Sequence, residues 1–441
     1  MISVVDIREN KDNELFSRLI GRNQLEQQDV LKTVNEIISN VRERGDQAVL
    51  EYTGLFDKVE LRPEELKVSP QELEEACKKV DKELLEVMRR AKNNIEAFHL
   101  KQKENSWFSS ENDGVILGQL YRPLDTVGIY VPGGTAVLTS SVLMNAVPAK
   151  VAGVRKIIMA TPPGRDGGIN AAVLAAAKEA GVDEIYKMGG AQAIAAMAFG
   201  TGIVPRVDKL FGPGNIYVAT AKRMVYGFCD IDMFAGPSEI MVVADDSANP
   251  KFVAADMLSQ AEHDILSAAI LVTTSEKLAN EVIREIERQF GGLSRKDIMK
   301  KSLKDYGAVV LVKSIDDAME VVNMIAPEHL ELCIEEPFNR LGDVRNAGAV
   351  FLGSYSSEPL GDYFAGPNHV LPTGGTARFF SPLNVADFVK KTSVISYTRK
   401  ALEKAKDDIV LFAQSEGLDG HANAIKIRFE EVVGTVLATS L

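Results

Sequence analysis

Cysteine is scarce in this chain: Cys77, Cys229 and Cys333 are its three cysteines, and no two of them form a C-x-x-C motif. An odd number of widely spaced cysteines argues against a disulfide framework and favours reduced thiols in the cytosol. No apolar run approaches the ~18 residues of a membrane span, and the first residues lack the basic start and apolar stretch of a signal peptide. The sequence therefore predicts a soluble, cytoplasmic protein without a membrane partner.

Positive charge is also in deficit. The chain has 62 acidic against 50 basic residues, a net charge of -12, and no basic run that could follow a phosphate backbone. We therefore expect no nucleic-acid partner and a small metabolite as ligand. At 441 residues, 46% of them hydrophobic, the chain is too long for one ordinary domain and can bury substantial cores, which predicts two or three domains.

The G-x-G-x-x-G fingerprint of dinucleotide binding is missing as well. Three other glycine turns each follow a predicted strand and precede a predicted helix, at 130–134, 189–192 and 211–215. Backbone N–H groups in such turns can approach a phosphate, although glycine turns also serve simple chain reversal. A phosphate-bearing ligand is thus expected at one sheet, but the spacing alone does not identify a nucleotide.

Short apolar runs that alternate with helices indicate the fold class from residue 127 onward. They form two consecutive sets of predicted strands, one at 127–131, 156–160, 184–188 and 209–211, and one at 240–244, 268–272, 308–312, 329–334 and 349–352. Such alternation is typical of parallel sheets. The sequence predicts an α/β protein with two similar, incomplete Rossmann-like domains, an arrangement that would fit an old duplication.

The segments around these sets define the expected domains. We expect an N-terminal arm at 1–25, a first α/β domain at 126–238, a helical segment at 26–125 that packs with 239–380 as the second α/β domain, and a small C-terminal tail domain at 381–441. The tail, with a strand near 392–397 and two helices, is too small for a core of its own.

The helical segment contains a predicted long helix and a histidine at its predicted end. The sequence from Ser69 to Glu72 is a capping box, and the apolar spacing that follows predicts one unbroken helix that ends near Phe98. His99 would then lie at the helix end as a C-terminal cation.

Candidate chemical groups lie in the second set. Gln260 and His263 stand three residues apart on one face of a predicted helix and could begin a metal site, although such a pair also occurs on surfaces. Glu328 and His329 open a predicted strand and bring two proton-transfer groups together; the alternative is an exposed pair at a strand start. Asp362 lies in a long glycine-rich loop, a type that is usually functional or mobile.

Together these segments resemble the histidinol dehydrogenase family, and the resemblance covers nearly the whole chain. The matching segments are 130–134, 189–195, 211–215, 235–239, 260–264, 327–331, 361–363, 368–373 and 416–421. One departure is Phe234, where the family pattern has proline; the change could reshape a pocket wall without removing a ligand.

The resemblance implies a zinc ion, one per subunit, and NAD as cofactors. It implies that zinc is bound by Gln260, His263, Asp362 and His421. It places around the substrate L-histidinol the residues Ser238, Gln260, His263, His329, Asp362, Glu416 and His421, and around NAD the residues Tyr130, Gln192 and Asn215. Glu358 and His369 are expected near the site. The family further implies a homodimer with shared active sites, in which the tail carries His421 to the partner subunit.

The implied reaction is the oxidation of L-histidinol to L-histidine through a bound aldehyde, with two NAD consumed, the last step of histidine biosynthesis. His329 would be the base of the alcohol step, and Glu328 would activate the water that adds to the aldehyde. No cysteine lies in a matching motif, which argues against a thiohemiacetal intermediate.

Three alternatives remain at the level of sequence. A related zinc-dependent NAD dehydrogenase could oxidise another amino or sulfonated alcohol, and a zinc hydrolase could use the same donors to activate water on an amide. A nucleotide-binding scaffold without catalysis is the third, and the Glu328-His329 pair argues against it. Formation of NADH separates the dehydrogenases from the other two classes.

Overall fold

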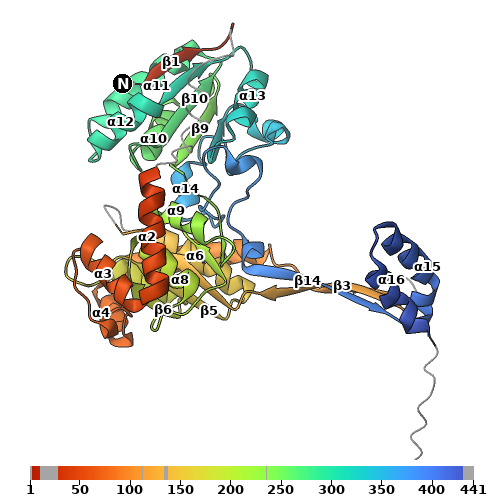
Figure 1. Cartoon of the computed structure of the whole chain (residues 1–441). Coiled ribbons are helices and arrows are strands. Elements are labelled where there is room, and N and C mark those ends of the chain that lie inside the picture. Colours follow the sequence, from red (N-terminus) through yellow and green to blue (C-terminus); the bar gives the residue numbers. More distant parts are fainter. Residues whose placement is uncertain (1, 10–27, 111–112, 134–137, 235, 431–441) are drawn as a thin grey trace, which may run out of the picture. The chain divides into compact units, whose positions relative to one another are not determined.

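The computed structural model describes residues 2–9, 28–110, 113–133, 138–234 and 236–430 (Figure 1). It contains two compact units, one made of Met1–Lys103 and Pro123–Phe388 and the other of Glu104–Arg122 and Val389–Leu441. Within the described ranges, no helix is both long and apolar enough to cross a membrane.

The first sheet is parallel and has the strand order β6-β5-β4-β7-β8. Its strands are β4 (Thr126–Tyr130), β5 (Lys156–Thr161), β6 (Glu184–Lys187), β7 (Lys209–Phe211) and β8 (Asp230–Ile231). The connecting helices are α6 (Thr139–Ala152), α7 (Ala171–Ala180), α8 (Gly190–Phe199) and α9 (Ile216–Val225). The predicted strands are confirmed, and the short β8 is added to them.

The second sheet repeats this topology with the order β1-β11-β10-β9-β12-β13. Its strands are β1 (Ser3–Asp6), β9 (Glu239–Ala244), β10 (Ala268–Thr273), β11 (Ala308–Leu311), β12 (His329–Cys333) and β13 (Ala349–Leu352). Its helices are α10 (Pro250–Ala261), α11 (Glu276–Phe290), α12 (Lys296–Tyr306), α13 (Ile315–Ile325) and α14 (Glu358–Tyr363). β4 in the first sheet and β9 in the second are central; in each sheet the next two strands along the chain lie on one side and the following two on the other, and β1 adds an edge strand beside β11. The prediction of two similar Rossmann-like domains is therefore confirmed.

The described part of the N-terminal arm belongs to this second sheet. β1 pairs in parallel with β11, from Ser3 opposite Ala308 to Asp6 opposite Leu311. Residues 10–25 of the predicted arm lie outside the described residues.

The helical segment packs on the first α/β domain. Its helices are α2 (Gln28–Arg44), α3 (Asp46–Phe56), α4 (Pro70–Lys79) and α5 (Lys82–Leu100). α2 contacts α8 and α9, α4 contacts α7, and α5 contacts α6. The expectation that residues 26–125 complete the second α/β domain is therefore wrong. Apolar spacing predicts which face of a helix is buried, but it does not say which element covers that face.

The predicted helix from 70 to 98 is in fact two helices. Val80 is extended, with φ -78° and ψ 136°, and Asp81 caps the second helix. The Asp81 carboxylate accepts the backbone N–H groups of Glu83 at 2.7 Å and Leu84 at 3.3 Å. The apolar period continues through the break, so an internal N-cap decides the local structure against the periodicity.

We expect Asp81→Ala to lower the free energy of unfolding by about 1 kcal/mol, because two N–H groups at the start of α5 lose their acceptor. Chemical denaturation monitored by circular dichroism measures this change. Asp81→Asn is the matched control, since its side-chain oxygen still caps the helix. Equal stability of the Ala and Asn variants would contradict the capping role.

His99 is a buried, neutral side chain rather than the helix-end cation that the sequence suggested. Its Nδ1–H donates to the carbonyl of Ile95 at 2.7 Å, and its Nε2 accepts the amide N–H of Asn368 at 3.3 Å. Burial lowers the pKa of the imidazole, against the opposing effect of its backbone hydrogen bonds. His99 therefore connects α5 to the glycine-rich loop that follows Asp362.

The second unit is a three-stranded sheet with two helices. Its strands have the order β14-β3-β2 and are β2 (Trp107–Ser109), β3 (Val115–Pro123) and β14 (Val389–Tyr397); the helices are α15 (Arg399–Ser415) and α16 (Asp419–Lys426). The strand and two helices of the tail are confirmed. The boundary at 381 is wrong, because the unit starts at 389 and recruits residues 104–122, which the sequence assigned to the helical segment.

This second unit has almost no core. Among its described residues, only Ala401 and Ala422 are buried apolar side chains. Large apolar side chains are exposed instead: Ile395 is 73% exposed, and Leu411 and Phe412 are each 70% exposed. An exposed apolar surface of this kind is typical of a surface that another protein covers.

Candidate active site

The three residues expected to contact NAD come together at the carboxyl edge of the first sheet. Tyr130 ends β4, and Gln192 lies in the first turn of α8, which follows β6. Asn215 caps α9 after β7, and its side-chain oxygen accepts the N–H groups of Tyr217 and Val218. This edge is where open α/β sheets bind ligands, because loops and helix N-termini converge there.

Close backbone packing explains the glycines of this edge. Gly212 has φ +107°, and a Cβ at this position would lie 2.0 Å from the carbonyl oxygen of Tyr130. No other residue fits there. The Tyr130 hydroxyl in turn accepts the N–H of Gly190 at 3.2 Å. Two of the three predicted glycine turns are therefore held against the end of β4.

Gln192 has the property expected of a ligand-binding amide. Its side chain is 1% exposed, and neither of its amide atoms has a hydrogen-bond partner within the described chain. Buried polar groups are nearly always paired in folded proteins. An unpaired amide at this edge is therefore available to a ligand; its place beside NAD stays a prediction.

The predicted metal donors lie at the amino edge of the second sheet, whereas the residues expected to contact NAD lie at the carboxyl edge of the first. α10 follows β9 and runs back along it, which returns the C-terminal end of the helix to the starts of the strands. Gln260 lies in its last turn, and His263 follows its end. Asp362 lies on α14. Ligand atoms of His263, Asp362 and Glu358 all lie within 4.8 Å of one another.

These donors fit a zinc ion. Gln260 is fully buried, and neither of its amide atoms has a hydrogen-bond partner among the described residues. Because buried polar groups are nearly always paired, this amide is available to a bound ligand or metal. An imidazole nitrogen and a carboxylate oxygen are common zinc ligands, and a neutral amide oxygen leaves the site positively charged.

Glu358 adds a second carboxylate to this cluster, where the family resemblance placed it only near the site. The side chain is 1% exposed, and the hydroxyl of Ser259 donates to its Oε2 at 3.1 Å. Burial, followed by the charge of Asp362, raises the pKa of Glu358 to about 8.

The proposed catalytic pair is held by the main chain of Glu239. The N–H of Glu239 donates to Glu328 Oε2 at 2.9 Å, and its carbonyl accepts the Nδ1–H of His329 at 3.0 Å. Glu328 is 5% and His329 is 3% exposed, so the alternative of an exposed pair at a strand start is wrong. Because Nδ1 donates, Nε2 carries the free lone pair of the neutral ring, and it lies 3.8 Å from Asp362 Oδ1.

Burial and mutual charge control the protonation of this pair. Burial raises the pKa of Glu328 to about 8, although His329 and the N–H of Glu239 oppose the shift. Burial disfavours the charged form of His329, but Glu328 and Asp362 outweigh it and raise its pKa to about 10. Burial likewise opposes ionisation of Asp362, yet His329 and His369 hold the pKa of that carboxyl well below its usual range. Both Glu328 and His329 therefore bind a proton more tightly than the same groups do in water.

The glycine-rich loop after α14 ties Asp362 to the first α/β domain. Asn368 donates from its side chain to the carbonyl of Met144 on α6 at 2.7 Å. His369 donates from Nδ1 to the carbonyl of Asp362 at 3.1 Å, and its Nε2 lies 3.5 Å from the hydroxyl of Ser141, also on α6. His369 is therefore a neighbour that orients Asp362, which agrees with its expected place near the site.

The remaining predicted substrate residues are divided between the two units. Ser238 directly precedes β9, and its carbonyl accepts the N–H of Ala268 at 3.0 Å. Glu416 follows α15 and His421 lies in α16, so both belong to the second unit, where both are exposed. Phe234, the departure from the family pattern, is 38% exposed.

Sequence reasoning missed Glu331, which lies behind the catalytic pair on β12. Its carboxylate accepts the backbone N–H of Glu358 at 2.8 Å and is 1% exposed. The available signal was an acidic residue inside an otherwise apolar strand, because such a residue is either at a surface or buried with a specific partner.

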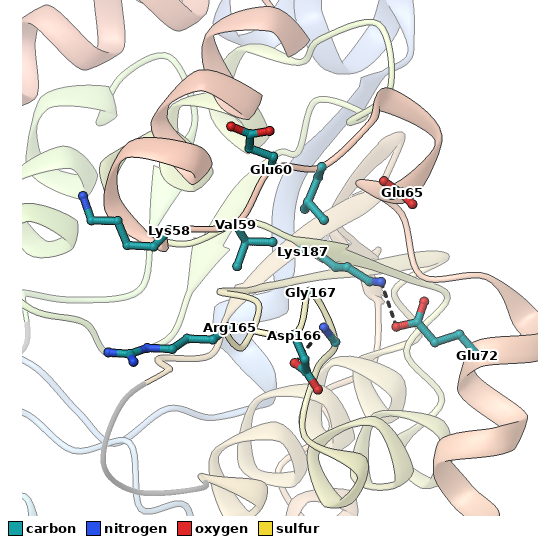
Figure 2. Close-up of a pocket in the computed structure, with 11 residues that line it drawn as sticks. Lys58, Val59, Glu60, Glu65, Glu72, Arg165, Asp166, Gly167 and Lys187 are labelled. Carbon is teal, nitrogen blue, oxygen red and sulfur yellow. Dashed lines mark hydrogen bonds and ion pairs between the residues drawn. The ribbon is translucent and has the colours of Figure 1, made fainter.

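A separate cavity of about 510 Å³ lies between the helical segment and the first α/β domain (Figure 2). Its lining combines four carboxylates with three cations, and Lys187 Nζ is paired with Glu72 Oε1 at 2.8 Å. None of the predicted site residues lines it. With charges of both signs around it, this cavity is not specialised for an anionic ligand.

Comparison with known proteins agrees with the geometry. The family model described as histidinol dehydrogenase matches residues 20–429. The chain is 57% identical to a histidinol dehydrogenase of Clostridium acetobutylicum over 94% of its length and 96% of the relative, and 57% identical to one of Listeria monocytogenes over 95% and 98%. A crystal structure of histidinol dehydrogenase from Elizabethkingia anophelis superposes with a TM-score of 0.91 at 40% identity, covering 97% of this chain and 98% of that one.

Proposed function

Because the chain belongs to the histidinol dehydrogenase family, we propose that it oxidises L-histidinol to L-histidine with NAD, through a bound L-histidinaldehyde, as the last step of histidine biosynthesis. The observation that carries the proposal is the buried Glu328-His329 pair, held against Glu239 with His329 Nε2 facing the donor cluster around Asp362. A general base must lie within reach of the hydroxyl proton that it removes, and this arrangement would place His329 beside a substrate held at the donor cluster.

In the alcohol step, His329 Nε2 would take the hydroxyl proton; NAD, when bound, would supply the acceptor for the hydride that leaves the alcohol carbon. The hydrogen bond from Nδ1–H to the Glu239 carbonyl keeps the ring in the required tautomer and orientation. In the aldehyde step, ionised Glu328 would take a proton from the water that attacks the carbonyl carbon, and NAD, when bound, would accept the second hydride from the hydrate. The N–H of Glu239 holds the Glu328 carboxylate for this role.

Gln260, His263 and Asp362 would hold zinc, one ion per subunit, together with His421. When bound, zinc supplies a positive charge that orients the imidazole and amine of the substrate and counters the charge of Asp362. On the cofactor side, Tyr130, Gln192 and Asn215 would contact NAD.

We further propose a homodimer in which His421 completes the site of the partner subunit. The support is the second unit, which carries both Glu416 and His421 and exposes Ile395, Leu411 and Phe412 without a core of its own. Covering these side chains with a second chain would stabilise the unit and place its ligand. The three free cysteines suit a reducing compartment and support a cytoplasmic location.

We expect the purified protein to form two NADH for each L-histidinol consumed, because aldehyde and alcohol are oxidised at one site. To test this stoichiometry, NADH is measured by its absorbance and the histidine formed is quantified by chromatography. Protein stripped by a chelator is the control and should regain activity with zinc. One NADH with release of aldehyde would refute the coupled reaction, and amide hydrolysis without NADH would indicate the zinc hydrolase instead.

A further inference from the structure

Strand β12 carries a second buried carboxyl group next to the catalytic pair. Glu331 follows His329 by two residues, so both side chains lie on the same face of the sheet. Its Oε1 accepts the N–H of Glu358, the first residue of α14, at 2.8 Å. Since α14 also carries Asp362, Glu331 holds the start of the short helix that supplies a metal donor.

The side chain of Glu331 also interacts with a second carboxyl group. No N–H or O–H donor within the described ranges reaches its Oε2, and the Glu331 side chain is linked to that of Asp256 on α10, both through charge and as a side-chain hydrogen-bond neighbour. Two carboxyl groups can hydrogen bond only when one of them is protonated. Burial and the nearby charge of Asp256 raise the pKa of Glu331 well above its usual range, which identifies Glu331 as the protonated partner.

Glu331 thereby connects the two helices that provide the metal donors. Asp256 precedes Gln260 by four residues, one turn of α10, and Glu358 precedes Asp362 by four residues on α14. We propose that Glu331 is a positioning residue that bridges Asp256 and the first N–H of α14, fixes the spacing of these helices and so sets the affinity for zinc. This inference rests on the metal site of the proposed function.

Two substitutions of Glu331 should differ in their effect on this bridge. In Glu331→Gln, the amide oxygen can still accept the N–H of Glu358, and the amide N–H₂ can donate to Asp256, so the bridge survives. In Glu331→Met, a side chain of similar size fills the space but offers neither contact. Because Glu331→Met leaves the N–H of Glu358 and the Asp256 carboxyl without this partner, it should also lower stability, and its unfolding must be measured beside its zinc affinity to separate positioning from folding.

Zinc affinity of the full-length protein, measured by competition with a chromogenic chelator, tests the proposal. We expect Glu331→Met to weaken zinc binding by about 10- to 100-fold, the usual cost of losing a contact that orients a metal ligand, and Glu331→Gln to stay within about threefold of wild type. Leu332→Val is the matched control on the same strand: its side chain lies on the opposite face in a different core cluster, so its zinc affinity should not change.

If Glu331→Met does not fold, Asp256→Ala provides the same measurement, since it removes the anchor of Glu331 and should weaken zinc binding by at least about threefold. If the Met variant, or Asp256→Ala in its place, binds zinc as tightly as wild type, this inference is overturned and the proposed function is not. Equal losses in the Gln and Met variants would also overturn it. Absence of zinc binding by the wild-type protein would overturn the proposed metal site and this inference with it.

Discussion

A mixture of two inactive variants, His329→Ala and His421→Ala, is expected to recover about a quarter of wild-type activity when the two are unfolded together and refolded. Each variant alone should lose nearly all activity, because one lacks the proposed base of the alcohol step and the other a proposed zinc ligand. The recovery depends on the proposal that His421 acts at the site of the partner subunit.

The expected value follows from random pairing of the two chains. About half of the dimers are mixed, and a mixed dimer has one site in which His329 and the partner's His421 are both intact. Its other site carries both lesions. One intact site of two, in half of the dimers, gives about a quarter of the full activity.

The control for this experiment is each variant refolded alone, at the same total concentration, with dimer formation checked by light scattering. If His421 served its own chain, every site in the mixture would keep one lesion and the mixture would stay inactive. That result would reject the shared site while leaving the proposed reaction intact.

Glu328→Gln is expected to slow oxidation of supplied L-histidinaldehyde by roughly 10²- to 10⁴-fold, the usual contribution of a general base, and to affect oxidation of the alcohol much less. Only the aldehyde step requires a water molecule to be activated. Single-turnover measurements of NADH formation from each substrate separate the two steps. Equal losses in both would remove the assigned role of Glu328.

The same residue predicts a pH dependence. Burial raises the pKa of Glu328 to about 8, and only its ionised form can accept a proton from water. We therefore expect kcat/KM for the aldehyde to rise roughly tenfold per pH unit below that pKa and to level off above it. Glu328→Gln should abolish this rise. Glu335→Gln, on an exposed carboxylate just after β12, removes the same charge and should leave the profile unchanged.

Local signals were sufficient to predict much of this fold. Continuous apolar runs such as 240–244 and 268–272 predicted strands that are confirmed, because strands buried on both faces have no polar alternation. The break at Asp81 was missed for a related reason: the apolar period crosses it, and only the cap contacts reveal that the helix restarts.

Pairing between distant segments was harder to predict. β2 and β3 join the tail strand β14 in one sheet although some 270 residues separate them in sequence, and no local pattern in 104–122 indicates that partner. The same holds for the helices from 28 to 100: their apolar faces were evident, but their attachment to the first α/β domain depends on which surface complements them.

By itself, the sequence determined the class of the fold, the glycine turns and, through family resemblance, the residues around the proposed site, because these depend on residue type and on short spacing. Only the tertiary structure decided how those residues act together. It brought His263, Glu358 and Asp362 within 4.8 Å, used the main chain of Glu239 to orient Glu328 and His329, and placed Glu331 between two helices. Such contacts join segments far apart in the chain, and their energies depend on burial, which a linear pattern does not contain.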